Sequence, residues 1–392
     1  MNKKRAKYII VPFIALLSTG FLLNVTNKDK ETSFSENRAL QQRPGIESIK
    51  DGTFTKKYEK YFSDQFIFRE EIMSFYDKVK IALGSNKIKS YYVLNNNWIM
   101  PTPTKELSSK EIKKTSKKIE ELSSENYGKK KEFYYVSTPH KETSLSHLYP
   151  KSIRGLSQAV ANRNEFMNDL KDSDVKFINI DEYFLSKFSK SERENLYFKT
   201  DHHWNGLGAF EGFKYMMEKM GLASDINWNE YTKSTLNRGT FLGSYNKNLN
   251  KLVKEKEEIQ YIHDKKNPHY KYFKYDGVKD VEVKEEDVMA TRKNESEILY
   301  GGAYMFGNAC NILKIKNENA VVDKKIIIFR DSYQSPMTWM LADVFSEVQL
   351  VDVRHTEKLN MTAKDMIKNS DADIVMFMYN DADFNDMIAQ IK

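Results

Sequence analysis

The chain of 392 residues carries 62 Lys and Arg against 55 Asp and Glu, a net charge of +7. Four of the positive charges lie within residues 1–7, which leaves only +3 for the rest of the chain. That mild balance gives no reason to expect a nucleic-acid-binding protein. The single cysteine, Cys310, excludes an intramolecular disulfide framework, which suits an exported protein that is stabilised by its core alone.

Residues 8–25 (YIIVPFIALLSTGFLLNV) form an uncharged apolar run behind the cationic residues 1–7. A run of about 18 residues can just cross a hydrocarbon core at ~1.5 Å rise per residue. The cationic flank should stay inside, so that the rest of the chain emerges outside. A cleaved signal peptide is the alternative, but no small-residue cleavage motif follows Leu23. We therefore expect residues 1–25 to be an uncleaved single-pass anchor with an extracellular ectodomain.

Residues 26–100 are expected to be a linker followed by a helical lead-in. Residues 26–45 are polar, as is typical of a linker. Aromatic and apolar residues recur at helical spacing over 46–84, which predicts two helices around SDQFIFR (63–69). Residues 88–99 contain an Asn-rich turn between apolar segments and predict a hairpin.

Residues 101–392 show the alternation of a doubly covered parallel sheet. Short apolar, β-rich segments that predict strands lie at 133–137, 175–180, 325–330, 347–351 and 373–379. Helical patterns lie between them at 109–122, 157–171, from the TDHHWN motif to about Met220, 337–345 and 362–369. Such alternation indicates an α/β fold with helices on both faces of the sheet. Ligands of these folds bind at the carboxyl ends of the strands.

Residues 224–300 interrupt this alternation with a highly charged stretch of short alternating segments. We expect a solvated, β-rich insertion within the α/β domain, rather than a segment with a direct catalytic role. His263 and His269 fall in this insertion without well-spaced ligand partners, so we expect both to be surface residues. No metal-type Cys/His cluster is apparent, and no metal or cofactor is predicted.

The stretch KTDHHWNGLGAFEGF (199–213) places Asp201 beside two of the seven histidines, His202 and His203, where a helix begins. This is either a capped helix start with two incidental imidazoles or half of a catalytic site. We expect the motif to follow a strand, which would bring its side chains to the ligand-binding edge of the sheet.

The stretch KKIIIFRDSYQSPMTWML (324–341) offers the other half. Its strand should end at Phe329, and Ser332 would lie in the turn before a helix that starts near Pro336. Taken alone, Ser and Asp before a helix are usually caps. A catalytic serine needs a base and an orienting carboxylate, which the histidine motif supplies. The strand 373–379 ends beside Asn380, whose amide could donate to an oxyanion.

The order of these motifs resembles the DHHW family of bacterial exported proteins, within the SGNH hydrolase superfamily in the permuted form of the alginate O-acetyltransferase-like (AlgX/AlgJ-like) group. The resemblance covers most of the ectodomain. It is carried by SENRAL (35–40), DGTFTKKYEKYFSDQFIFR (51–69), TPHKETSL (138–145), TDHHWN (200–205), YGGAYMFGNACNILKIKN (300–317), RDSY (330–333) and VDVRH (351–355). The resemblance implies a three-layer SGNH hydrolase-like α/β fold.

By the same resemblance, Ser332 is the nucleophile, His203 the general base and Asp201 its orienting carboxylate. Asn380 resembles the oxyanion asparagine, although Met378 and Arg330 stand where the superfamily usually has glycine.

Further residues are expected around the oxyanion or substrate: Arg354, His202, His140, Lys141 and Tyr333. For Arg354 the alternatives are binding of an anionic group or acyl oxygen, and a structural role as a salt bridge to Asp352 or a surface charge. His202 is expected to be structural or substrate-facing, rather than the base. Trp204 is expected to pack in the core, rather than to stack on a sugar.

The resemblance implies an extracytoplasmic serine acyltransferase that O-acetylates a cell-envelope polysaccharide. A separate membrane-bound O-acyltransferase would supply the acetyl groups. A polysaccharide O-acetylesterase would use the same residues with water as the acceptor. A non-catalytic protein that binds or assembles wall polymers is the third hypothesis, and the intact Ser/His/Asp set speaks against it.

Overall fold

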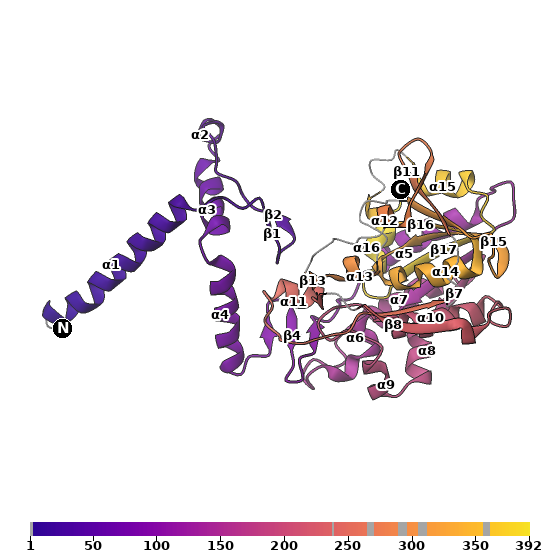
Figure 1. The fold of residues 1–392 in the computed structure, drawn as a ribbon, viewed down its shortest axis with the longest axis horizontal. Helices are drawn as coiled ribbons and strands as arrows, with labels where there is room; N and C mark the ends of the chain where they lie inside the picture. The colour runs from indigo at the N-terminus through magenta and orange to yellow at the C-terminus, as the bar shows by residue number, and fades with distance from the viewer. Residues whose placement is uncertain (1–2, 237–238, 265–269, 289–295, 305–311, 356–360) are drawn as a thin grey trace. The chain divides into compact units, whose positions relative to one another are not determined.

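The computed structural model describes residues 3–236, 239–264, 270–288, 296–304, 312–355 and 361–392. The chain divides into two compact units (Figure 1). Unit 1 comprises Met1–Lys89 and Tyr245–Lys254, and unit 2 comprises Ser90–Ser244 and Glu255–Lys392. The predicted site residues all fall in unit 2.

Unit 1 is mainly helical. Its elements are α1 Lys3–Thr26, β1 Thr32–Ser33, β2 Arg38–Ala39, α2 Glu47–Lys50, α3 Phe54–Gln65, α4 Arg69–Ala82 and β3 Lys87–Ile88. The predicted pair of helices around residues 63–69 is confirmed, because α3 ends and α4 begins there. Arg38 fixes this corner by donating two hydrogen bonds to the Asp64 carboxylate, at 2.9 and 2.7 Å.

The predicted anchor lies on α1. Among the residues that the structure describes, no helix has both the length and the apolar character that crossing a bilayer requires. The anchor therefore stays a prediction.

Unit 2 is built on a mixed sheet, which has eight strands within the described residues, in the order β12-β11-β14-β16-β15-β17-β6-β7 (Figure 1). The strands are β6 Glu132–Thr138, β7 Val175–Asn179, β11 Lys271–Tyr275, β12 Asp280–Val283, β14 Ile312–Lys316, β15 Val322–Arg330, β16 Phe345–Val351 and β17 Ile374–Asn380. The run from β16 to β7 is parallel, and it contains the strand segments predicted from the sequence.

Helices cover both faces of this sheet. Alternate residues of a strand point to opposite faces, so Ile326 and Ile328 of β15 enter one apolar cluster, whereas Ile327 and Phe329 enter the other. The first cluster is closed by α8 Ile180–Lys187, α10 Gly206–Lys219 and α14 Thr338–Val344. The second is closed by α5 Ser109–Ser124, α7 Ala159–Asp169, α15 Ala363–Asn369 and α16 Phe384–Ala389. The three-layer α/β arrangement is therefore confirmed.

The hairpin predicted over residues 88–99 is found as β4 Tyr91–Val93 paired antiparallel with β5 Ile99–Pro101. Asn97 lies in its turn with a φ of 67°, a left-handed conformation that asparagine tolerates better than most residues.

The insertion at 224–300 is β-rich as predicted, and most of its described residues are exposed or partly exposed, but part of it is buried. Its strand β11 extends the central sheet as the antiparallel neighbour of β14, and β12 pairs antiparallel with the other side of β11. The other elements are β8 Tyr231–Thr235, β9 Thr240–Phe241, α11 Ser244–Asn248, β10 Gln260–Asp264, α12 Glu285–Val288, β13 Glu297–Ile298 and α13 Tyr300–Tyr304. Phe241, Ile298 and Tyr300 form a third apolar cluster around Phe198, which precedes the histidine motif.

Of the two histidines expected at the surface of this insertion, His263 lies on β10, partly buried, with its Nδ1 3.0 Å from the Asp264 carbonyl oxygen. His269 lies outside the described residues.

Candidate active site

Ser332 lies directly beyond the carboxyl end of β15, as predicted. Asp331 caps the 3-10 turn Ser332–Met337, and its Oδ1 accepts a hydrogen bond of 2.9 Å from the Tyr333 backbone. Its Oδ2 accepts two further bonds of 2.8 Å, from the backbone N–H and the side-chain amide of Asn380 at the end of β17. The serine is therefore held on a turn that is tied to the neighbouring strand.

The prediction that the histidine motif directly follows a strand is wrong. Two helices, α8 and α9 Lys190–Glu194, lie between β7 and the motif. The loop that carries it closes on itself through a bridge between Tyr197 and Trp204 and a hydrogen bond of 3.3 Å from the Phe198 N–H to the His203 carbonyl. Asn205 then caps α10 by accepting from two backbone N–H groups.

The loop and the turn meet, so the three predicted catalytic side chains form one chain of hydrogen bonds. His203 Nε2 lies 2.7 Å from Ser332 Oγ, and His203 Nδ1 lies 2.6 Å from Asp201 Oδ1. The Asp201 carboxylate also accepts from the His203 backbone N–H at 3.0 Å. Asp201 and His203 are buried, whereas Ser332 is partly exposed. Of these three hydrogen-bonded side chains, the serine is therefore the one that solvent can reach.

Burial and mutual charge set the protonation of these groups. Burial raises the pKa of Asp201, but the charges of His202 and His203 and the hydrogen bond from His203 hold it well below its usual range. Burial lowers the pKa of His203, and Asp201 offsets part of that effect. His203 is therefore neutral at pH 7 and can accept a proton from Ser332.

His202 occupies a different environment from His203. Its Nδ1 lies 2.9 Å from Ser244 Oγ, and about a quarter of its side chain is exposed. Burial, followed by the charge of His203, lowers the pKa of His202 to about 4, so the ring is neutral at pH 7. The 2.7 Å contact with the Ser332 hydroxyl is made by His203 Nε2, and the expectation that His202 is not the base stays a prediction.

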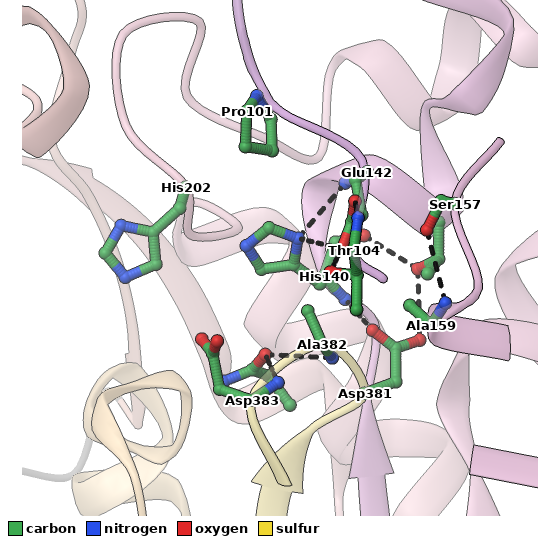
Figure 2. A network of polar contacts seen from close by, with 12 residues as sticks. Pro101, Thr104, His140, Glu142, Ser157, Ala159, His202, Asp381, Ala382 and Asp383 are labelled. Carbon is green, nitrogen blue, oxygen red and sulfur yellow. Dashed lines mark hydrogen bonds and ion pairs between the residues drawn. The ribbon is translucent and has the colours of Figure 1, made fainter. Parts of the chain in front are cut away.

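His140 lies on the far side of His202, with ring centroids 6.2 Å apart. Its Nδ1 accepts a hydrogen bond of 3.3 Å from the Glu142 N–H and caps α6 Lys141–Ser144, so the neutral ring carries its proton on Nε2. Figure 2 shows the His140 ring between Glu142 and His202, with Asp383 beside the two imidazoles. The expected substrate contact of His140 stays a prediction.

Two other residues that were expected near the substrate, Lys141 and Tyr333, make hydrogen bonds within the protein. Lys141 is fully buried, and its Nζ donates to the carbonyl oxygens of Ile99 and Lys199 at 3.2 and 2.8 Å. Burial lowers the pKa of Lys141 to about 7. The Tyr333 hydroxyl donates to the His202 carbonyl at 2.7 Å. The substrate contacts expected of Lys141 and Tyr333 stay predictions.

Of the two alternatives for Arg354, the structure shows the salt bridge. Its Nε and Nη2 donate to the two oxygens of Asp352 at 2.9 and 2.7 Å. Anion binding by Arg354 stays a prediction. The Asn380 amide is likewise used, because it donates to Asp331, and its oxyanion role stays a prediction.

Trp204 packs in the core, as predicted. It is fully buried, and its Nε1 donates to the Tyr333 carbonyl at 2.9 Å, which joins the histidine loop to the serine turn. The glycines that follow it permit close approach: a Cβ on Gly206 would lie 2.0 Å from the Gln260 carbonyl oxygen, and one on Gly208 would lie 2.4 Å from that of Leu196. The glycines of this helix are therefore explained by packing.

Sequence reasoning missed three contributions from the insertion. Ser244 donates its backbone N–H to Asp201 Oδ2 at 2.6 Å. Glu257 accepts from the backbone N–H groups of Lys199 and Thr200 at 2.5 and 3.1 Å, which fixes the residues before Asp201. Tyr300 stacks on the His203 ring. Of these three residues, only Tyr300 could have been noticed in the sequence, because it begins the YGGAY stretch that carries the family resemblance. Nothing in the spacing marked Ser244 or Glu257.

The donor atoms of Asp201, His202 and His203 lie within 4.8 Å of one another. Asp201 and His203 already bond to each other, and His203 bonds to Ser332, so hydrogen bonding accounts for this cluster without a metal ion.

No protein-family model and no curated protein sequence matches the chain. Several solved structures do match the chain. Two structures of Bacillus cereus PatB1, the first with a sulfonyl adduct, have TM-scores of 0.66 and 0.65 at 24% and 26% identity. The matches cover 78% and 77% of this chain, and 100% of each PatB1 chain.

A DHHW family protein from Eubacterium siraeum has a TM-score of 0.58 at 19% identity, covering 78% of this chain and 96% of its own. The O-acetyltransferase domain of Pseudomonas putida AlgJ matches more weakly, with a TM-score of 0.44 at 10% identity over 76% of this chain and 92% of its own, which is too distant to support an argument. The chain thus has the fold of a DHHW family protein, and the expected resemblance to that family is confirmed at the level of the fold.

Proposed function

We propose that this protein is an extracytoplasmic serine O-acyltransferase that acetylates a cell-envelope polysaccharide. In the first half-reaction, Ser332 Oγ attacks the carbonyl carbon of an acetyl donor while His203 Nε2 takes the serine proton. The bond from the acyl carbon to the leaving group then breaks, and His203 returns the proton to that group. Acetyl-Ser332 remains.

In the second half-reaction, a sugar hydroxyl loses its proton to His203 and attacks the acetyl carbon. The bond to Ser332 Oγ breaks, and the proton passes from His203 to the serine. Throughout, Asp201 holds the imidazole with one nitrogen toward the serine and stabilises its charged form. No metal or cofactor takes part in these steps.

The observation that carries the proposal is the pair of short distances at His203, 2.7 Å to Ser332 and 2.6 Å to Asp201. The carbonyl oxygen becomes negative in the tetrahedral intermediate and needs donors. Ser332 is the first residue of the 3-10 turn Ser332–Met337, so its backbone N–H has no acceptor within that turn and can donate to the oxyanion. The second N–H of the Asn380 amide is the other candidate.

The likeness to PatB1 supports the proposed nucleophile. Sulfonyl reagents are captured by activated nucleophiles, and PatB1 has been solved with a sulfonyl adduct. The fold of this chain over 78% of its length is that of PatB1, and its own Ser/His/Asp chain supplies the activation that such a reaction requires.

Two alternatives use the same fold. An O-acetylesterase would pass the acetyl group from Ser332 to water instead of a sugar. A non-catalytic polymer-binding protein would need none of the three side chains in hydrogen-bonding contact. We propose the transferase because the family resemblance implies it, together with a membrane-bound partner that delivers acetyl groups outside the cell. Residues 8–25 would anchor the chain beside that partner.

The test is covalent labelling of the intact protein with phenylmethylsulfonyl fluoride. One adduct by intact mass, located on Ser332 by peptide mapping, is expected. Ser332→Ala should fold normally, because a turn residue contributes ~1 kcal/mol or less. It should take no adduct, and cells that carry it should lose O-acetyl groups from the envelope polymer.

A matched control is Ser335→Ala, in the same turn but outside the hydrogen-bonded chain. It should keep both labelling and acetylation. If the Ser332 variant retains acetylation, the enzyme reading is wrong. If acetylation rises instead, the chemistry is right and the protein is an esterase.

A further inference from the structure

The two flat faces of the His203 imidazole are both covered by rings. The Tyr300 ring lies parallel to it, with centroids 3.6 Å apart and an interplanar angle of 5°. On the His202 side the centroids are 3.7 Å apart, and the planes are tilted by 35°. The hydrogen bonds to Asp201 and Ser332 fix the edge of the imidazole. The ring is therefore constrained in every direction.

Tyr300 is held firmly enough to act as one wall of this enclosure. It is 5% exposed and begins α13, directly after β13, which pairs with β9. Its ring also contacts Tyr304 at 5.0 Å and Phe198 at 6.3 Å. Within the described part of the chain its hydroxyl makes no hydrogen bond. What Tyr300 contributes is therefore the face of its ring.

The electrostatics of that face suit a positive neighbour. The face of an aromatic ring is negative and attracts a cation, more strongly when water is excluded. His203 is buried and becomes an imidazolium whenever it takes the proton of Ser332. The other charged or titratable groups around it are Asp201 and His202 on its own loop, Tyr333 on the serine turn, His140 and Lys141 at the start of α6, and Arg354 after β16. Asp201 is the one anion among them.

We propose that Tyr300 is a positioning residue for the base: its ring face keeps the His203 imidazole in the plane that reaches both Asp201 and Ser332, and it stabilises the positive charge that forms on the imidazole. This inference rests on the proposed function, since it assigns a role in the same proton transfer. It also gives the insertion a direct part in the chemistry.

The test compares Tyr300→Leu with Tyr300→Phe and with Tyr304→Leu. Leucine removes the ring face, whereas phenylalanine keeps it and removes only the unbonded hydroxyl. Tyr304 lies on the same helix and is equally buried, but its ring is not among those that contact His203. For each variant, the rate of Ser332 sulfonylation is measured from pH 4 to 9, together with the melting temperature.

For Tyr300→Leu we expect the plateau rate to fall by about tenfold and the midpoint of the pH profile to move down by about one unit, the size of a desolvated cation–π contact. The direction follows because the lost ring favoured the protonated imidazole. Tyr300→Phe should restore the midpoint and keep the rate within about threefold. Tyr304→Leu should lower the melting temperature and leave the midpoint in place.

An unchanged midpoint in Tyr300→Leu, with a loss of stability like that of Tyr304→Leu, would mean that Tyr300 only packs, and the inference would be overturned. Failure of the proposed function looks different, because the wild-type protein would then take no adduct at any pH. In that case the His203 pKa is read directly from the ¹⁵N imidazole shifts of the wild-type and Tyr300→Leu proteins. A downward shift still supports the inference, and no shift rejects it.

Discussion

Gly243 allows the insertion to approach the catalytic loop, and its replacement by alanine should disable the site without touching a catalytic group. A Cβ on Gly243 would lie 2.2 Å from both the carbonyl carbon and the carbonyl oxygen of Thr200. Atoms of this kind pack at about 3.5 Å, so the overlap is about 1.3 Å. The obstacle is backbone, which cannot rotate aside as a flexible side chain could. The two segments must therefore separate.

That separation acts on both sides of Asp201. Thr200 directly precedes it, and Ser244, which follows Gly243, donates the 2.6 Å hydrogen bond to its Oδ2. A displacement of about 1 Å in a catalytic constellation costs about 10²-fold in rate. We expect Gly243→Ala to lower the rate of Ser332 sulfonylation, and the turnover of a chromogenic acetyl ester, by about 10²-fold. Overpacking should cost about 1–3 kcal/mol of stability.

Two glycines provide controls. Gly45→Ala places its methyl group in open space and should behave as the wild type. Gly221→Ala puts a side chain on a residue with φ +74° and no atom within 4 Å of the Cβ, so it should lose stability through backbone strain alone. If Gly243→Ala keeps wild-type rates, or loses rate only as far as Gly221→Ala does at equal stability, the steric argument is refuted.

Three further predictions test the base, its titration and the topology. His203→Ala should lower turnover of an acetyl ester by orders of magnitude, while His202→Ala should cost less than tenfold; the reverse ranking would reassign the base. Because burial puts the pKa of His203 below 6.5, and the base must be neutral, activity should fall as pH drops through a midpoint below 6.5. A midpoint above 7 would contradict this. Protease added to intact spheroplasts should digest residues 26–392, and full protection beside digested lysates would reject the predicted orientation.

The parts of this fold that could be predicted from sequence are those encoded locally. The apolar, β-branched run of β15 and the strand of β17 are legible because both faces of a central parallel strand are buried. Ser332 could be placed for the same reason, since a turn residue directly after such a strand must lie at the ligand-binding edge. The Asn-rich turn and the two helices of the lead-in were likewise set by neighbouring residues.

The histidine loop shows where local reasoning fails. The helices α8 and α9 separate it from β7, so its position does not follow from the order of the strands. The loop is placed instead by long-range contacts, such as Glu257 with Lys199 and Ser244 with Asp201. Contacts between residues more than 40 positions apart leave no periodic trace in either segment. For this reason the role of the charged insertion was misjudged. Its composition predicts an exposed segment, whereas its hydrogen bonds show that part of it supports the histidine loop.

The same contacts bear on the choice between sugar and water as the acetyl acceptor. The chain Asp201–His203–Ser332 is common to a transferase and an esterase, so it cannot decide the outcome. Access is what could decide it: among the described residues, Asp201 and His203 are buried and Tyr300 and His202 cover the imidazole faces, whereas Ser332 and the edge of His202 are partly exposed. A sugar that binds there and displaces water would receive the acetyl group ahead of bulk solvent. If the proposed function is right, the side chains around Ser332 and His202, rather than the three that both reactions share, determine which of the two reactions takes place.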